Sequence, residues 1–176
     1  KIAYYTAYLK AHFPVEFMAS LLTSEQSDVE KIGFLIEECK RMGIEILPPD
    51  INESFRNFSV VPGKNQIRFG LLAIKNVGEN TVEAIVKERK EKGAFSSLSD
   101  FFSRVEPGNL NKKSLESLIK SGALDRFGER NQLLFNLEKL LEWNKSNFKK
   151  EKQKQGGLFD SLSNKQSKNL EIKLEK

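Results

Sequence analysis

The chain has 176 residues, 39% of them apolar and 13 of them phenylalanine, which is enough for one or two domains with a hydrophobic core. One cysteine, Cys39, and one histidine, His12, exclude an internal disulfide and a transition-metal site built from such residues, and both are expected to be buried in helices. No apolar run is long enough to span a membrane and no signal peptide is recognised, so we expect a cytoplasmic protein without a membrane partner.

The net charge of +5 is concentrated near the C-terminus. Residues 145–176 contain nine lysines and four acidic residues, whereas residues 1–144 contain twenty basic and twenty acidic side chains. Because residues 1–144 are neutral as a whole, we do not expect this segment to bind nucleic acid by strong electrostatic attraction. Any contact of this segment with phosphates must therefore be local. The lysine-rich end is either a source of weak additional affinity or a solvated linker.

Three helices are predicted in the first 43 residues. The first covers residues 2–12, and because the chain begins inside it, we expect a piece of a longer protein. Pro14 suits the first turn of the second helix. Asp28 is expected to cap the third, which ends at Gly43, where left-handed backbone angles are favoured. The apolar face of this third helix is predicted to comprise Val29, Ile32, Leu35, Ile36 and Cys39.

A small sheet is predicted next. Residues 44–47 form a short extended segment, which Pro48 and Pro49 stop. Residues 58–61 and 66–69 flank a Pro-Gly-Lys-Asn turn and predict a β-hairpin. This hairpin is expected to be the one sheet of the chain.

The segment 71–89 is the most informative part of the sequence. It predicts a short apolar element, a tight turn at Asn76-Val77-Gly78, and a helix with one apolar face. Asn and Gly readily adopt left-handed angles, so the reversal can be tight. The backbone amides around Val77 to Thr81 are then expected to be free at the positive end of a helix, which makes a phosphate site. The alternative is an ordinary helical corner within a core.

The helices predicted downstream include a second tight connection. After a break at Gly93, a short helix is expected from Ser99-Asp100, and Asn111 caps a helix that Gly122 closes. Residues 123–128 then form a tight connection into a long helix at about 129–150. This second helix-turn-helix is expected to be a degenerate partner to the segment 71–89. The long helix carries a stripe that is expected to lie in the core: Leu133, Leu134, Leu137, Leu140 and Leu141.

One apolar cluster, Gln155-Gly156-Gly157-Leu158-Phe159, interrupts the polar tail. The two glycines oppose a continuing helix, so the Leu-Phe pair is exposed unless it docks on a surface. That surface is either this chain's own domain or a groove on a partner, which two apolar anchors of a short peptide would fill. The pattern resembles the peptide that binds sliding clamps.

Several segments, in chain order, closely resemble bacterial replicative DNA polymerase III alpha subunits, the C-family polymerases. Residues 5–22 resemble the end of that family's fingers region, and residues 38–52 resemble the segment after it. Residues 68–78 and 110–125 are similar to its helix-hairpin-helix domain, and Gln155–Phe159 falls where these subunits carry a clamp-binding peptide. Together with the predicted elements, the resemblance implies a mainly α, multi-helical fold with tandem helix-hairpin-helix motifs and one small β-hairpin.

The resemblance also implies parts, partners and contacts. Residues 1–50 would be the end of the fingers, residues 51–150 the helix-hairpin-helix domain, and residues 151–176 a lysine-rich linker with the clamp peptide. The implied partners are primed or duplex DNA, the sliding clamp and other replisome subunits. The expected DNA-backbone contacts are Lys75, Asn76, Val77, Gly78, Glu79, Asn80, Thr81, Lys112 and Lys113, and the expected clamp contacts are Gln155, Gly156, Gly157, Leu158 and Phe159.

Two positions depart from the usual helix-hairpin-helix pattern. Asn76 stands where the motif commonly has glycine, so the turn is expected to survive while the asparagine side chain crowds a phosphate. Val82 stands where a small alanine is common, so the two helices are expected to pack slightly further apart.

The family's catalytic aspartates, which bind two Mg²⁺ ions in a palm domain, have no counterpart in this sequence. Asp50, Asp100 and Asp125 are scattered rather than paired at metal-binding spacing, so no catalytic residue, metal or cofactor is assigned. The expected role is processivity: the chain would hold duplex DNA and tether the polymerase to its clamp. Two rivals are a scaffold whose hairpins bind replisome proteins without touching DNA, and a module of a repair enzyme or ligase.

Overall fold

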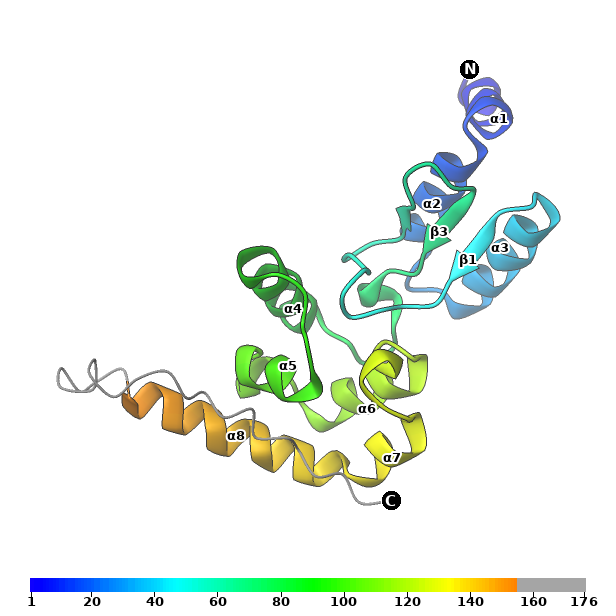
Figure 1. Cartoon of the computed structure of the whole chain (residues 1–176). Coiled ribbons are helices and arrows are strands. Elements are labelled where there is room, and N and C mark those ends of the chain that lie inside the picture. The colour runs from blue at the N-terminus through cyan, green and yellow to red at the C-terminus, as the bar shows by residue number, and fades with distance from the viewer. Residues whose placement is uncertain (155–176) are drawn as a thin grey trace.

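A computed structural model describes residues 1–154 (Figure 1). Helices dominate this part of the chain, so the predicted mainly α fold is confirmed, and none of its helices is long and apolar enough to cross a membrane. The elements are α1 (Ile2–His12), α2 (Pro14–Ser24), α3 (Val29–Arg41), β1 (Glu45–Leu47), β2 (Ser59–Val60), β3 (Gln66–Arg68), η1 (Leu71–Ala73), α4 (Glu79–Lys92), α5 (Leu98–Arg104), η2 (Pro107–Asn109), α6 (Lys112–Ser121), η3 (Asp125–Phe127), α7 (Arg130–Phe135) and α8 (Leu137–Lys154), where η marks a 3-10 helix.

A first hydrophobic core lies between α2, α3 and the sheet. Pro14 occupies the first turn of α2, where a missing N–H costs no helical bond. Asp28 caps α3 by accepting the Lys31 N–H at 3.1 Å, and Gly43 follows the helix with a φ of 71°, both as predicted. The buried members of this core are Val15, Met18, Ala19, Leu22, Ile32, Leu35, Cys39, Ile44, Phe58 and Ile67.

The sheet has the strand order β1-β3-β2. The predicted hairpin is present, because β2 pairs antiparallel with β3 and sets Val60 opposite Ile67. On its other side β3 accepts β1 as a parallel neighbour, with Ile46 opposite the same Ile67. Ile67 is therefore the centre of the sheet and is fully buried. The extended segment predicted at residues 44–47 is thus a third strand of this sheet.

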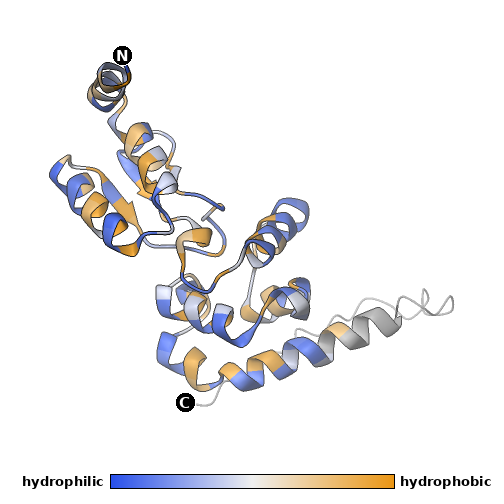
Figure 2. Ribbon diagram, turned by 180° about the vertical axis from the view of Figure 1, so that it is seen from behind, coloured by the Kyte–Doolittle hydropathy of each residue, from blue (hydrophilic) through white to orange (hydrophobic). Residues whose placement is uncertain are grey.

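A second core is built by the elements from η1 to α8. The predicted caps of α6 are present: Asn111 accepts the Ser114 N–H at 2.9 Å, and Gly122 ends the helix with a φ of 87°. In Figure 2 the apolar positions of α8 gather mainly in the half next to α7, and this half packs on the core. The largest fully buried residues of this core include Phe101, Phe102, Ile85, Leu115, Leu118 and Ile119.

Two helices differ from the prediction. α5 begins at Leu98 rather than at Ser99-Asp100, because Ser97 caps it by accepting the Asp100 N–H at 3.1 Å. The long helix predicted at about 129–150 is broken at Asn136 into α7 and α8. The Asn136 side chain donates to the Gln132 carbonyl at 2.9 Å, and a side chain that bonds its own helix competes with the helical backbone ladder.

Two residues that were predicted to be buried are exposed. His12 lies on the surface of α1, with its ring 4.2 Å from that of Tyr8, and Val29 at the start of α3 is 73% exposed. Cys39 is buried as predicted, and burial raises the pKa of its thiol to about 11. Helical spacing places residues on one face, but only a facing element buries them.

The chain passes between the two cores more than once. Ile51 belongs to the second core, whereas Phe58 and Ile67 belong to the first. The Ile51 N–H donates to the Ala123 carbonyl at 2.9 Å, and the Ile51 carbonyl accepts from Arg89 at 2.9 Å. The change of core therefore does not coincide with residue 50, and the division of the chain at that residue stays a prediction.

Candidate nucleic-acid interface

The turn before α4 has the geometry that the sequence predicts. Asn76 adopts a left-handed φ of 64°, and Gly78 then takes an extended conformation and starts α4 at Glu79. The element before the turn is the 3-10 helix η1 rather than an α-helix. The first N–H groups of an α-helix have no acceptor within the helix, and Gly78 has no side chain to supply one. The amides of residues 79–81 therefore point outward at the positive end of α4.

Three other helix starts in the described chain are closed by side chains, whereas α1, α2 and α7, like α4, have no side-chain cap. Asp28, Ser97 and Asn111 each accept a backbone N–H from the first turn of α3, α5 and α6. At α6 two such bonds are present, because the Ser114 hydroxyl oxygen also accepts the Asn111 N–H at 3.0 Å. The start of α4 thus keeps donors that these three helices have already used.

Two of the predicted contact residues are engaged within the protein. The Val77 N–H donates to the Ile74 carbonyl at 3.1 Å and its side chain is buried, so the expectation of a free Val77 amide is wrong. The Thr81 hydroxyl donates to the Asn109 carbonyl, which leaves only the Thr81 backbone for a ligand. The available amides are those that follow Gly78.

Charges of both signs surround this helix start. Lys75 is exposed beside the turn, and Glu79 opens α4 with a carboxylate. Arg56 forms ion pairs with Glu79 and, at 3.3 Å, with Glu83, and so offsets the nearest negative charge. A role for Arg56 could not be predicted from the sequence, because no local pattern connects it to a helix that starts more than twenty residues later.

The two lysines predicted on α6 have different environments. Lys112 lies 2.6 Å from the Glu138 carboxylate of α8, and this hydrogen bond raises the pKa of Lys112. Lys113 is exposed on the face that also carries Ser117, whose hydroxyl accepts from the Asn76 side chain at 3.3 Å. Lys113 therefore lies on the same side of α6 as the residue that contacts the turn, whereas Lys112 is directed toward α8. The Asn76 side chain is tied to α6, where crowding of a phosphate had been expected.

The second tight connection, at residues 122–128, is occupied by the protein itself. The Arg130 guanidinium pairs with the Asp125 carboxylate and covers Gly122, where an added Cβ would meet both side chains. The Ala123 carbonyl accepts the Ile51 N–H from the loop after β1. This connection is therefore engaged in internal contacts.

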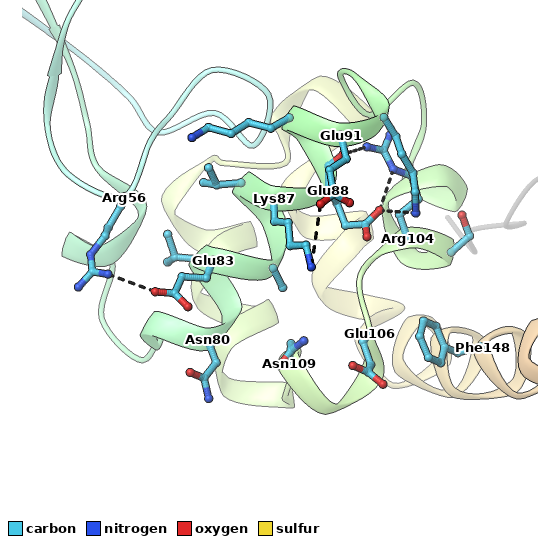
Figure 3. Close-up of a pocket in the computed structure, with 16 residues that line it drawn as sticks. Arg56, Asn80, Glu83, Lys87, Glu88, Glu91, Arg104, Glu106, Asn109 and Phe148 are labelled. Carbon is cyan, nitrogen blue, oxygen red and sulfur yellow. Dashed lines mark hydrogen bonds and ion pairs between the residues drawn. The ribbon is translucent and has the colours of Figure 1, made fainter.

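A cavity of about 980 Å³ lies along α4 (Figure 3), and Asn80 stands at its edge. Figure 3 shows Arg56 directed toward Glu83, and Arg104 directed toward Glu88 at 3.6 Å. Four of the five cations that line the cavity are thus paired with carboxylates of the same cavity. This lining does not make an anion site comparable to the start of α4.

The clamp-binding peptide Gln155–Phe159 lies outside the described residues. Within residues 1–154, no group of three or more His, Cys, Asp or Glu side chains is arranged to hold a metal ion.

Comparisons with known proteins agree in pointing to one family. A family model described as a helix-hairpin-helix motif matches residues 43–133. The DNA polymerase III subunit alpha of Thermus aquaticus is 51% identical over 142 residues, or 81% of this chain, and that of Deinococcus radiodurans is 51% identical over 80% of it. The Borreliella burgdorferi subunit is 45% identical over 162 residues, or 92% of the chain. These matches cover 12%, 10% and 14% of the relatives' lengths, so the chain spans a small part of each.

Proposed function

Because this chain belongs to the family of DNA polymerase III alpha subunits and carries its helix-hairpin-helix motif, we propose that it binds the backbone of primed or duplex DNA without reading bases. The uncapped start of α4 supports this proposal most directly. Outward amides at the positive end of a helix are suited to one phosphate group, and a phosphate carries no sequence information. Lys75 adds a cation beside them, while Arg56 offsets Glu79.

The start of α4 would bind DNA locally and with moderate affinity. Residues 1–144 carry equal numbers of basic and acidic side chains, so the body as a whole does not attract DNA. A few amides and lysines suit an enzyme that must slide along its template. Affinity for the template would then come from a second attachment.

We propose that Gln155–Phe159 provides that attachment by binding the sliding clamp. Its leucine and phenylalanine would enter an apolar slot on the ring, and the glutamine would hydrogen-bond at its edge. A tether to a ring around DNA raises the effective concentration of the DNA at the α4 site, so two weak contacts reinforce each other. Other replisome subunits are further partners in this proposal.

A rival function is a scaffold whose hairpins bind replisome proteins and never touch DNA. The neutral body favours this rival. Binding of the full chain to primed DNA at several salt concentrations separates the two, because phosphate contacts produce a linear fall of log affinity with log salt. A scaffold without DNA contact shows no such binding.

Replacing Lys75 with glutamate together with Gly78 with valine is expected to weaken DNA binding equally for all DNA sequences. The loss of about one phosphate contact should reduce the salt slope by about one. Valine at position 78 blocks a phosphate without straining the protein, because the backbone is extended there and nothing lies within 4 Å of an added Cβ.

The matched control for this variant is Lys40→Glu with Gly33→Val, two exposed positions on α3 with the same change of charge and volume. Fluorescence anisotropy with two unrelated duplexes provides the measurement. If the Lys75/Gly78 variant stays folded and binds DNA with the affinity of the control, the turn before α4 has only a structural role.

We also propose that this chain by itself has no polymerase activity and needs no cofactor, since the Mg²⁺-binding palm aspartates of the family have no counterpart in its sequence. The pure chain is expected to extend no labelled primer in the presence of Mg²⁺ and four nucleotides. Gel analysis of the primer, with a complete polymerase as the positive control, tests this. Extension that co-purifies with the chain would contradict it.

A further inference from the structure

One face of α6, on the side that contacts the turn before α4, carries a row of polar and basic residues. Lys113, Ser117 and Lys120 are spaced by four and three residues, so they lie on the same side of the helix. The opposite side is buried in the second core through Ser114, Leu115 and Leu118. Both lysines are exposed, so their ammonium groups are accessible to a partner.

The turn before α4 is joined to the middle of this row. The Asn76 side chain donates from Nδ2 to the Ser117 hydroxyl at 3.3 Å. Glycine at position 76 would satisfy the left-handed φ of 64° but could not form this bond. Asn76 therefore links the uncapped start of α4 to a helix that begins more than thirty residues later.

The lysines of α6 differ in their partners. Lys112 lies about 100° around the helix from Lys113 and pairs with Glu138 of α8. Lys120 pairs with Glu116 at 2.5 Å, in a contact whose side chains are 61% and 40% exposed. Such surface pairs contribute little to stability, so Lys120 can exchange its carboxylate for a phosphate at small cost.

We propose that Lys113, Ser117 and Lys120 form a second contact with the backbone of the same duplex DNA that the start of α4 holds. This inference rests on the proposed DNA-binding function; it keeps Lys113 among the expected backbone contacts and adds Ser117 and Lys120 of the same helix. Asn76 acts as a positioning residue, because it fixes the turn against α6. The second connection at residues 122–128 takes no phosphate, because Arg130 and Asp125 cover it.

The spacing of the two lysines fits a DNA strand. Seven residues of α-helix correspond to about 10.5 Å along the helix axis. The two ammonium groups are therefore far enough apart to contact two different phosphates of one strand. A contact between lysine and phosphate reads no sequence, because every nucleotide presents the same phosphate.

The test is binding of the full chain to duplex DNA between about 0.05 and 0.2 M salt. Lys113→Glu with Lys120→Glu is expected to weaken binding at least about tenfold at 0.1 M salt and to reduce the salt slope by about two. Lys113→Gln with Lys120→Gln is expected to reduce the slope equally with a smaller loss of affinity, because it removes contacts without adding repulsion. The control is Lys40→Glu with Lys64→Glu, exposed lysines of the first core region.

The results distinguish this inference from the proposed function. If the Lys75/Gly78 variant loses affinity while both α6 variants keep the wild-type affinity and slope, the hairpin binds DNA and the α6 contact is refuted. If the wild-type chain shows no salt-dependent binding, the proposed function fails and the α6 contact fails with it. A slope reduced by about two in both α6 variants, with an unchanged control, establishes the contact.

Discussion

Replacing Gly70 with alanine is expected to lower the free energy of unfolding by about 3 kcal/mol, at the upper part of the usual range for overpacked sites. An added Cβ at this position would lie 2.5 Å from the Asn57 carbonyl carbon and 2.7 Å from the Phe58 nitrogen. Both are backbone atoms, so no side-chain rotation relieves the contact. One of the two chain segments must move.

The close approach at Gly70 has a structural cause. The Leu71 N–H donates to the Phe55 carbonyl at 2.9 Å, and the Leu72 N–H donates to the Arg56 carbonyl at 3.0 Å. These bonds hold the segment before β2 against η1, at the passage between the two cores. Displacing them loosens the first and second cores together.

Thermal unfolding followed by circular dichroism measures this effect, and about 3 kcal/mol corresponds to a fall in Tm of about 6–12 °C for a chain of this size. Gly33→Ala in the exposed middle of α3 is the control. Nothing lies within 4 Å of an added Cβ at position 33, so alanine should raise stability by up to about 1 kcal/mol. Equal Tm values of the Gly70 variant and the wild type would contradict the close packing at Gly70.

Replacing both Leu158 and Phe159 with alanine is expected to abolish binding to the sliding clamp and to leave the Tm of the chain nearly unchanged. Two apolar side chains entering a pocket contribute on the order of 3–6 kcal/mol by burial, against the cost of ordering a few linker residues. That balance gives a dissociation constant of roughly micromolar size, which suits a contact that is made and released. Their removal takes away most of the interaction.

Calorimetry of the full chain with the clamp from the same organism provides the measurement. Leu170→Ala with Leu174→Ala is the matched control, since it removes two apolar side chains from the same end of the sequence. Undiminished clamp binding by the Leu158/Phe159 variant refutes the assignment of this peptide. A fall in Tm by many degrees also refutes it, because the pair would then belong to the chain's own core.

The sequence by itself determined the elements that depend on short-range chemistry. Asp28 and Asn111 cap α3 and α6 because their side chains reach backbone donors three residues ahead, and those donors are always present. Gly43 and Gly122 end or follow helices with positive φ because glycine alone adopts it without cost. The turn at Asn76-Val77-Gly78 and the start of α4 also depend on short-range chemistry.

Only the tertiary structure decided which of these local features are free to bind. Val77 and Thr81 are engaged by the Ile74 and Asn109 carbonyls, and the second turn is covered by the Arg130–Asp125 pair. Long-range partners also set the parallel pairing of β1 with β3 and the exposure of His12.

The contacts that complete the candidate site are of this second kind. Arg56 reaches Glu79 across twenty-three positions of sequence, and Asn76 reaches Ser117 across forty-one. Helical spacing and capping signals extend over about four residues, so they carry no information about such pairs. The Asn76–Ser117 hydrogen bond joins the turn before α4 to α6 only in the folded chain, and it depends on how the second core packs.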